Sequence, residues 1–169
     1  MDKAETYARQ VFEELVRRAH VLGAAYPFTT NGLTITWNAQ TNSTYLFCLG
    51  LSYFDDIELD MRTREFETIV KTAAISYFGG TAVRVGAPWK TSKITSYKKL
   101  LESVSEMIPE LGPPTRTAAP AGGDGGWDVV LVNNFIDKKC ARIIALGNCA
   151  TGRTDWKQKG RENTPTFFW

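Results

Sequence analysis

Apolar residues recur at helical spacing in three stretches of the chain. In residues 2–22 they follow one another at intervals of mostly three or four positions, as on one face of an α-helix. The members of this stripe are Ala4, Ala8, Val11, Phe12, Leu15, Val16, Ala19 and Leu22. Residues 63–78 repeat the pattern and end at Gly79-Gly80, a pair typical of a helix C-terminus. Residues 93–108 are also amphipathic, so the pattern predicts a helix in each stretch.

Shorter apolar stretches predict one more helix and several strands. Residues 43–54 begin with capping residues and are too apolar for an exposed helix, so we expect a buried one. Alternating or continuous apolar runs bounded by turn residues are typical of strands. The expected strands are residues 33–37, after a turn at Asn31-Gly32, and residues 81–88, 127–132 and 142–149.

The composition is that of a soluble globular protein with no bulk preference for nucleic acid. The 169 residues are 43% hydrophobic and 22% charged, and the formal net charge is only +2. No apolar run approaches the roughly 20 residues of a membrane span, and the first ten residues lack the apolar stretch of a signal peptide. The three cysteines have no metal-like spacing, so we expect reduced thiols and a cytoplasmic protein.

The residue types limit the chemistry. His20 is the single histidine, which excludes most zinc sites and any Ser-His-Asp or Cys-His mechanism that uses more than one imidazole ring. It stands late in the first predicted helix, where a surface or packing role is favoured over a catalytic one. The acidic run of residues 55–60 is better explained as a solvated linker than as a metal site, because nothing orients its carboxylates. The glycine-rich stretch of residues 122–126 lacks the Gly-Lys-Ser/Thr ending of a nucleotide-binding loop. Carboxylates, lysines and a metal ion remain for any catalysis.

Asp128 stands at the start of a buried strand, behind that glycine-rich loop. The connection between this strand and the next is short and polar, so the two are expected to form an antiparallel hairpin. A turn centred on Lys138 pairs Asp128 with Asn148 and brings a carboxylate and an amide together at one end of a sheet. The competing interpretation is that Asp128 only bonds backbone amides of the glycine loop, while Asp124 within that loop is a turn residue.

These features, in this order, resemble the PD-(D/E)XK nuclease superfamily, and most closely the Mrr-like restriction endonucleases. The matching segments are "REFETIVKTAAISYFGG", "GGDGGWDVV" and "ALGNCATG", within residues 63–152. The resemblance assigns the helix carboxylate to Glu67 and the strand aspartate to Asp128. Asn148 falls on the Glu/Gln position, and Ala150 falls on the position of the family's lysine.

The resemblance implies a single α/β domain with a restriction-endonuclease-like mixed sheet of about four strands, flanked by helices. Residues 61–169 would be the nuclease-like core, and residues 1–60 a helical and strand extension. The end of the chain on Phe-Phe-Trp indicates either a domain cut from a longer protein or an end that packs back onto the core.

The implied activity is Mg²⁺- or Mn²⁺-dependent cleavage of DNA in bacterial restriction or anti-phage defence. Glu67, Asp128 and Asn148 would be the metal ligands, and Lys157 or Lys159 would replace the lysine missing at Ala150. Because that position is empty, the alternative is an inactive nuclease-like module that binds nucleic acid or a partner protein. For Glu67 the simpler interpretation is an exposed helix residue.

DNA is the implied partner, with no membrane association, and another defence-system subunit or a second copy of the chain is a further possible partner. Basic residues that could hold phosphates cluster between the strand at residues 81–88 and the helix at residues 93–108, and others flank the hairpin. They are Arg84, Lys90, Lys93, Lys98, Lys99, Arg116, Lys138, Lys139, Arg153, Lys157, Lys159 and Arg161. Most of them are expected to be solvated.

Overall fold

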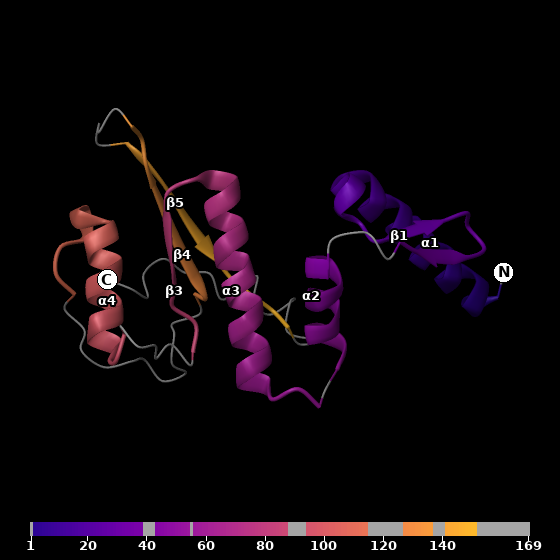
Figure 1. Cartoon of the computed structure of the whole chain (residues 1–169), viewed down its shortest axis with the longest axis horizontal. Helices are drawn as coiled ribbons and strands as arrows, with labels where there is room; N and C mark the ends of the chain where they lie inside the picture. The colour runs from indigo at the N-terminus through magenta and orange to yellow at the C-terminus, as the bar shows by residue number, and fades with distance from the viewer. Residues whose placement is uncertain are drawn as a thin grey trace. The chain divides into compact units, whose positions relative to one another are not determined.

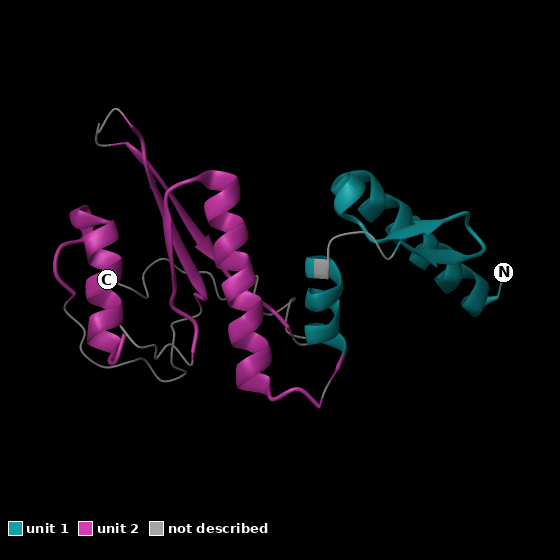
Figure 2. Cartoon of the chain, viewed as in Figure 1, with its two compact units in different colours: residues 1–53 teal, residues 54–169 magenta. Residues whose placement is uncertain are grey.

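The computed structural model of the chain combines helices and strands, which confirms the α/β part of the predicted fold class. It describes residues 2–38, 43–54, 56–87, 94–114, 127–136 and 141–151. The chain forms two compact units, residues 1–53 and 54–169 (Figure 2). Each unit has its own antiparallel sheet, of two strands in the first and three in the second among the described residues.

The first unit combines two helices with a hairpin. Its elements are α1 (Lys3–Leu22), the short 3-10 helix η1 (Gly23–Ala25), β1 (Phe28–Thr30), β2 (Ile35–Trp37) and α2 (Ser43–Tyr53). The predicted turn at Asn31-Gly32 is confirmed: Asn31 Oδ1 accepts hydrogen bonds from the backbone of Leu33 at 3.0 Å and Thr34 at 2.8 Å. Gly32 has a φ of 86°, which a side chain would oppose.

One expectation about this first unit is confirmed and one is wrong. The predicted strand at residues 33–37 is found as β2, which pairs with β1 along the hairpin. The helix over residues 43–54 is not buried: in α2 only Leu51 is inaccessible, while Phe47 and Tyr53 are at least half exposed. An apolar composition indicates that a helix is more stable when it is buried. It does not show whether another part of the protein covers the helix.

The second unit holds the larger sheet. Its elements are α3 (Leu59–Phe78), β3 (Thr81–Arg84), α4 (Tyr97–Met107), the 3-10 helix η2 (Pro109–Leu111), β4 (Val129–Asn134) and β5 (Arg142–Gly147). The strand order is β3-β4-β5, and both pairs are antiparallel. The mixed sheet of about four strands is therefore not found in the described residues, because the strand expected earlier in the chain is paired within the first unit.

The two faces of this sheet are covered by different helices (Figure 1). Alternate positions of the strands, including Val83, Val130 and Val132, pack with the buried residues Leu100 and Val104 of α4. The opposite face of β3 meets α3, where Arg84 contacts Glu67. The helix predicted at residues 63–78 therefore flanks the sheet, as expected.

Local capping explains where the helices begin and end. α3 starts at Leu59, four residues before the predicted start at Thr63, so the end of the acidic run of residues 55–60 lies in its first turn. It ends at Gly79 as predicted, where the Gly79 amide donates to Ile75 O at 2.9 Å. α4 starts at Tyr97 because the Ser96 side chain caps it by accepting a hydrogen bond from the Lys99 amide.

Candidate functional site

The hairpin of β4 and β5 has the register that the sequence predicts. Val129 pairs with Gly147 and Val132 with Ile144, so the pairing continues to Asp128 opposite Asn148. The Asp128 amide donates to Gly147 O at 3.0 Å. The Asp128 carbonyl accepts from the amides of Val85 at 2.8 Å and Gly86 at 3.1 Å, which closes the end of β3 against β4.

Asp128 is a buried carboxylate at this end of the sheet. It is 2% exposed, and its Oδ2 accepts a hydrogen bond from the Cys149 amide at 2.5 Å. A backbone amide is the kind of partner that the competing interpretation of Asp128 required, although this one belongs to the β5 segment and not to the glycine loop. The bond fixes the carboxylate beside Asn148, whose side chain is half-buried.

Glu67 is not an exposed helix residue, because it is 1% exposed in the middle of α3. Its Oε2 accepts a hydrogen bond from Arg84 Nη1 at 2.7 Å, in an ion pair whose guanidinium is 8% exposed. The same Nη1 donates to Gly86 O at 2.8 Å. A buried carboxylate costs much free energy unless it is paired, and Arg84 supplies that pairing.

Gly86 lies against the Glu67 side chain and bonds to the Asp128 backbone, and it was not among the site residues predicted from the sequence. A Cβ at this position would lie 2.5 Å from Glu67 Oε2 and 2.6 Å from Oε1, so a side chain has no room. The Gly86 amide bonds to the carbonyl of Asp128. The signal was available in "RVGAP", since a glycine directly after a strand often marks a close approach of another group. Glu67, Asp128 and Asn148 therefore stand at the same end of the β3-β4-β5 sheet.

The side-chain oxygens of Glu67, Asp128 and Asn148 are the kind of ligand that a hard cation such as Mg²⁺ prefers. The positive charge of Arg84 would repel such a cation. Across the described ranges, no three His, Cys, Asp or Glu side chains form a metal-binding group. A site built on Glu67 and Asp128 would therefore rely on the amide oxygen of Asn148 as its third ligand. Ala150 is half-buried, and its side chain has no polar atom. Lys157, Lys159 and Asp124 lie outside the described residues.

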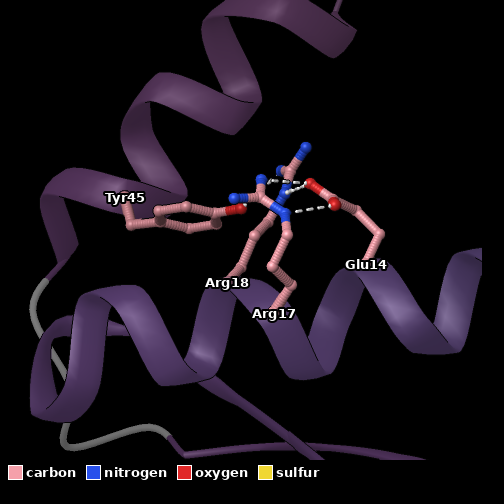
Figure 3. Close-up of polar contacts among 4 residues, drawn as sticks. All are labelled: Glu14, Arg17, Arg18 and Tyr45. Atoms are coloured by element: carbon pink, nitrogen blue, oxygen red, sulfur yellow. Dashed lines mark hydrogen bonds and ion pairs between the residues drawn. The ribbon is translucent and has the colours of Figure 1, made fainter.

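A second charged cluster, absent from the sequence analysis, lies in the first unit (Figure 3). Glu14 accepts hydrogen bonds from Arg17 Nε and Arg18 Nε, each at 2.7 Å, and Arg18 Nη1 donates to Tyr45 Oη at 2.9 Å. The Arg17 and Arg18 guanidinium groups lower the pKa of Glu14 from 4.5 to about 2. The cluster links α1 to α2, and its side chains satisfy one another, so its evident role is structural.

No helix in the described part of the chain has the length and apolarity to cross a membrane. Comparison with protein-family models, with curated proteins and with solved structures finds no match for this chain.

Proposed function

We propose that this protein is a metal-dependent DNA endonuclease of the PD-(D/E)XK type. The observation that carries the proposal is that Glu67, Asp128 and Asn148 stand at the same end of the β3-β4-β5 sheet, with Glu67 and Asp128 both buried. Buried carboxylates are costly unless they are paired, and here Arg84 pairs with Glu67 while the Cys149 amide bonds to Asp128. The order of the motifs along the chain, and the hairpin that brings Asp128 opposite Asn148, both support the same class of site.

Glu67, Asp128 and Asn148 would hold Mg²⁺ or Mn²⁺, and the bound ion would activate water and offset charge on a phosphate. The protein's own contribution is positional. The Cys149 amide fixes the Asp128 carboxylate, and Gly86 leaves room for Glu67. Arg84, held at 2.7 Å from Glu67, is a cation already beside the place where phosphate charge would develop.

The position of the missing lysine would be filled by Lys157 or Lys159. A lysine near the attacking water helps to orient or deprotonate it, and such help is typically worth about 10²–10⁴-fold in rate. The setting in bacterial restriction or anti-phage defence belongs to the same proposal and comes from the resemblance.

A second candidate is a module of the same fold that binds DNA without cutting it. The observation favouring it is the ion pair between Arg84 and Glu67, which satisfies the carboxylate without a metal ion. Ala150 at the lysine position favours it as well. The two candidates differ in one measurable property, which is cleavage.

Incubation of the purified chain with supercoiled plasmid, in Mg²⁺, Mn²⁺ or EDTA, tests the first candidate. We expect nicked or linear DNA in either metal and none in EDTA. Asp128→Ala should abolish cleavage and also remove Mn²⁺ binding measured by calorimetry, whereas Asp56→Ala, which changes an exposed carboxylate of the same unit, should do neither. Lys157→Ala or Lys159→Ala should slow cleavage while Mn²⁺ binding is retained.

The opposite result is also specific. If the wild-type chain binds DNA but leaves it intact in both metals, and Asp128→Ala binds DNA equally well, the endonuclease proposal is wrong and the binding module replaces it. Circular dichroism of each variant separates loss of activity from loss of fold.

A further inference from the structure

We propose that a cavity along β3 binds the phosphate groups of a nucleic-acid strand. The cavity has a volume of about 630 Å³ and lies within the second unit, between α3, β3 and α4. Its lining residues are Arg64, Thr68, Lys71, Thr81, Ala82, Val83, Arg84, Ile94, Ser103, Glu106 and Met107. The ligand class, nucleic acid, rests on the proposed function, but the binding itself needs neither metal nor cleavage.

The charge of the lining favours an anion. Three of the side chains are cationic, Arg64, Lys71 and Arg84, and Glu106 is the single carboxylate among them. Arg64 is exposed and has only a loose ion pair with Glu65, at 3.6 Å. Within the described residues Lys71 has no ion-pair partner, so two of the three cations are available to a ligand.

The two available cations, Arg64 and Lys71, both belong to α3. Arg64 and Lys71 are seven residues apart on α3, which is about 10 Å along the helix axis. Phosphates of one DNA strand succeed one another at 3.4 Å along the axis, so this spacing spans about three of them. Hydroxyl groups of Thr81 and Ser103 lie on the same lining and are suitable further donors to phosphate oxygens.

The backbone of β3 adds to the cavity. β3 is at the edge of the three-stranded sheet, and in the part of the chain that the structure describes no strand pairs with its other side. Edge strands present backbone N–H and C=O groups outward, so an extended peptide could also add to this edge. The positive charges of Arg64 and Lys71 favour phosphate over a peptide backbone, which has no net charge.

Arg84 connects the cavity to the candidate metal site. It lines the cavity and at the same time holds Glu67 at 2.7 Å. A strand whose phosphates contact Arg64 and Lys71 would therefore extend toward the sheet end where Glu67 and Asp128 meet. The cavity would position the DNA, and the sheet end would act on it.

Fluorescence anisotropy with labelled duplex DNA, in EDTA and over a series of salt concentrations, tests this assignment. We expect Arg64→Gln and Lys71→Gln each to weaken binding and to reduce the salt dependence by about one phosphate contact. Glu106→Gln should strengthen binding, because it removes the one negative charge of the cavity. Lys3→Gln is the matched control: it removes an exposed lysine of α1, in the first unit, and should bind like the wild type.

The outcomes distinguish this inference from the proposed function. If Arg64→Gln and Lys71→Gln bind DNA as well as Lys3→Gln does, the cavity assignment is wrong, whatever the cleavage assay shows. If inorganic phosphate raises the melting temperature of the wild type but not of Lys71→Gln, while no variant or wild type binds DNA, the cavity holds small anions only and the assignment is also overturned. If both variants lose DNA binding and the wild type shows no metal-dependent cleavage, the cavity assignment is supported and the endonuclease proposal is wrong.

Discussion

At the scale of single residues, Gly86 has the largest structural consequence at the candidate site. It is buried, and the space of its absent side chain is taken by the Glu67 carboxylate. A glycine is needed here because the Glu67 side chain of α3 and the Asp128 backbone, just before β4, both approach this position. The requirement is steric, so it holds whether or not a metal ion binds.

Gly86→Ala is expected to destabilise the fold by about 1–3 kcal/mol, the usual cost of forcing extra atoms into a packed interior. The added methyl group would push against the ion pair of Glu67 and Arg84. Chemical denaturation measures the effect. Gly147→Ala is the control, because its Cβ would lie 3.4 Å from the nearest atom, an ordinary contact. Equal stability of the two variants would show that the close approach at Gly86 does not exist.

At the scale of elements, α1 and α2 are joined by polar and aromatic contacts. Arg18 of α1 bonds to Tyr45 of α2, and the Tyr45 ring packs edge-on against Tyr26 with centroids 5.1 Å apart. No residue of α1 itself is buried. These contacts therefore link the two helices without a buried residue on α1.

The Glu14 carboxylate makes this connection dependent on pH. Its pKa is lowered by Arg17 and Arg18 to about 2 in the folded chain, against 4.5 ordinarily. A lowered pKa means that the contribution is complete above about pH 4.5 and is lost as the pH falls toward 2. Carbon-13 NMR titration should show Glu14 ionising well below the ordinary value of 4.5 for a glutamate side chain. Replacement of both arginines by glutamine should return Glu14 to the ordinary range, and high salt should reduce the difference.

At the scale of the whole molecule, most of the buried apolar core belongs to the second unit. β4 is bonded on both sides, and Val129, Val130, Leu131 and Val132 are each at most 2% exposed. The first unit has few buried apolar residues, and all three residues of β2 are exposed. The two units should therefore differ in local stability.

Hydrogen exchange followed by mass spectrometry checks this difference. Amides of β4 should exchange slowest, at rates that approach global unfolding, and those of β1 and β2 should exchange much faster. The physical reason is that β4 opens only when both neighbouring strands and the α4 core separate. Equally slow exchange in β2 would mean that its exposed side chains are covered in solution.

The sequence by itself determined the local elements and one non-local pairing. Helical periodicity placed α1, α3 and α4, and the glycine pair ended α3, because these signals depend on residues a few positions apart. The short polar connection fixed the hairpin register, since in an antiparallel pair a turn centre sets every partner. That is why Asp128 could be matched with Asn148 from the sequence.

Only the tertiary structure decided what the sheet contains and what surrounds each carboxylate. β2 pairs with β1, the strand just before it in the chain. The alternating pattern predicts a strand, but it does not show which strand will be its partner. The partnership of Glu67 with Arg84, 17 positions away, and the role of Gly86 depend on how α3 crosses the face of β3. The cavity of Arg64, Lys71 and Arg84 likewise arises from packing, because residues of three separate elements form its wall.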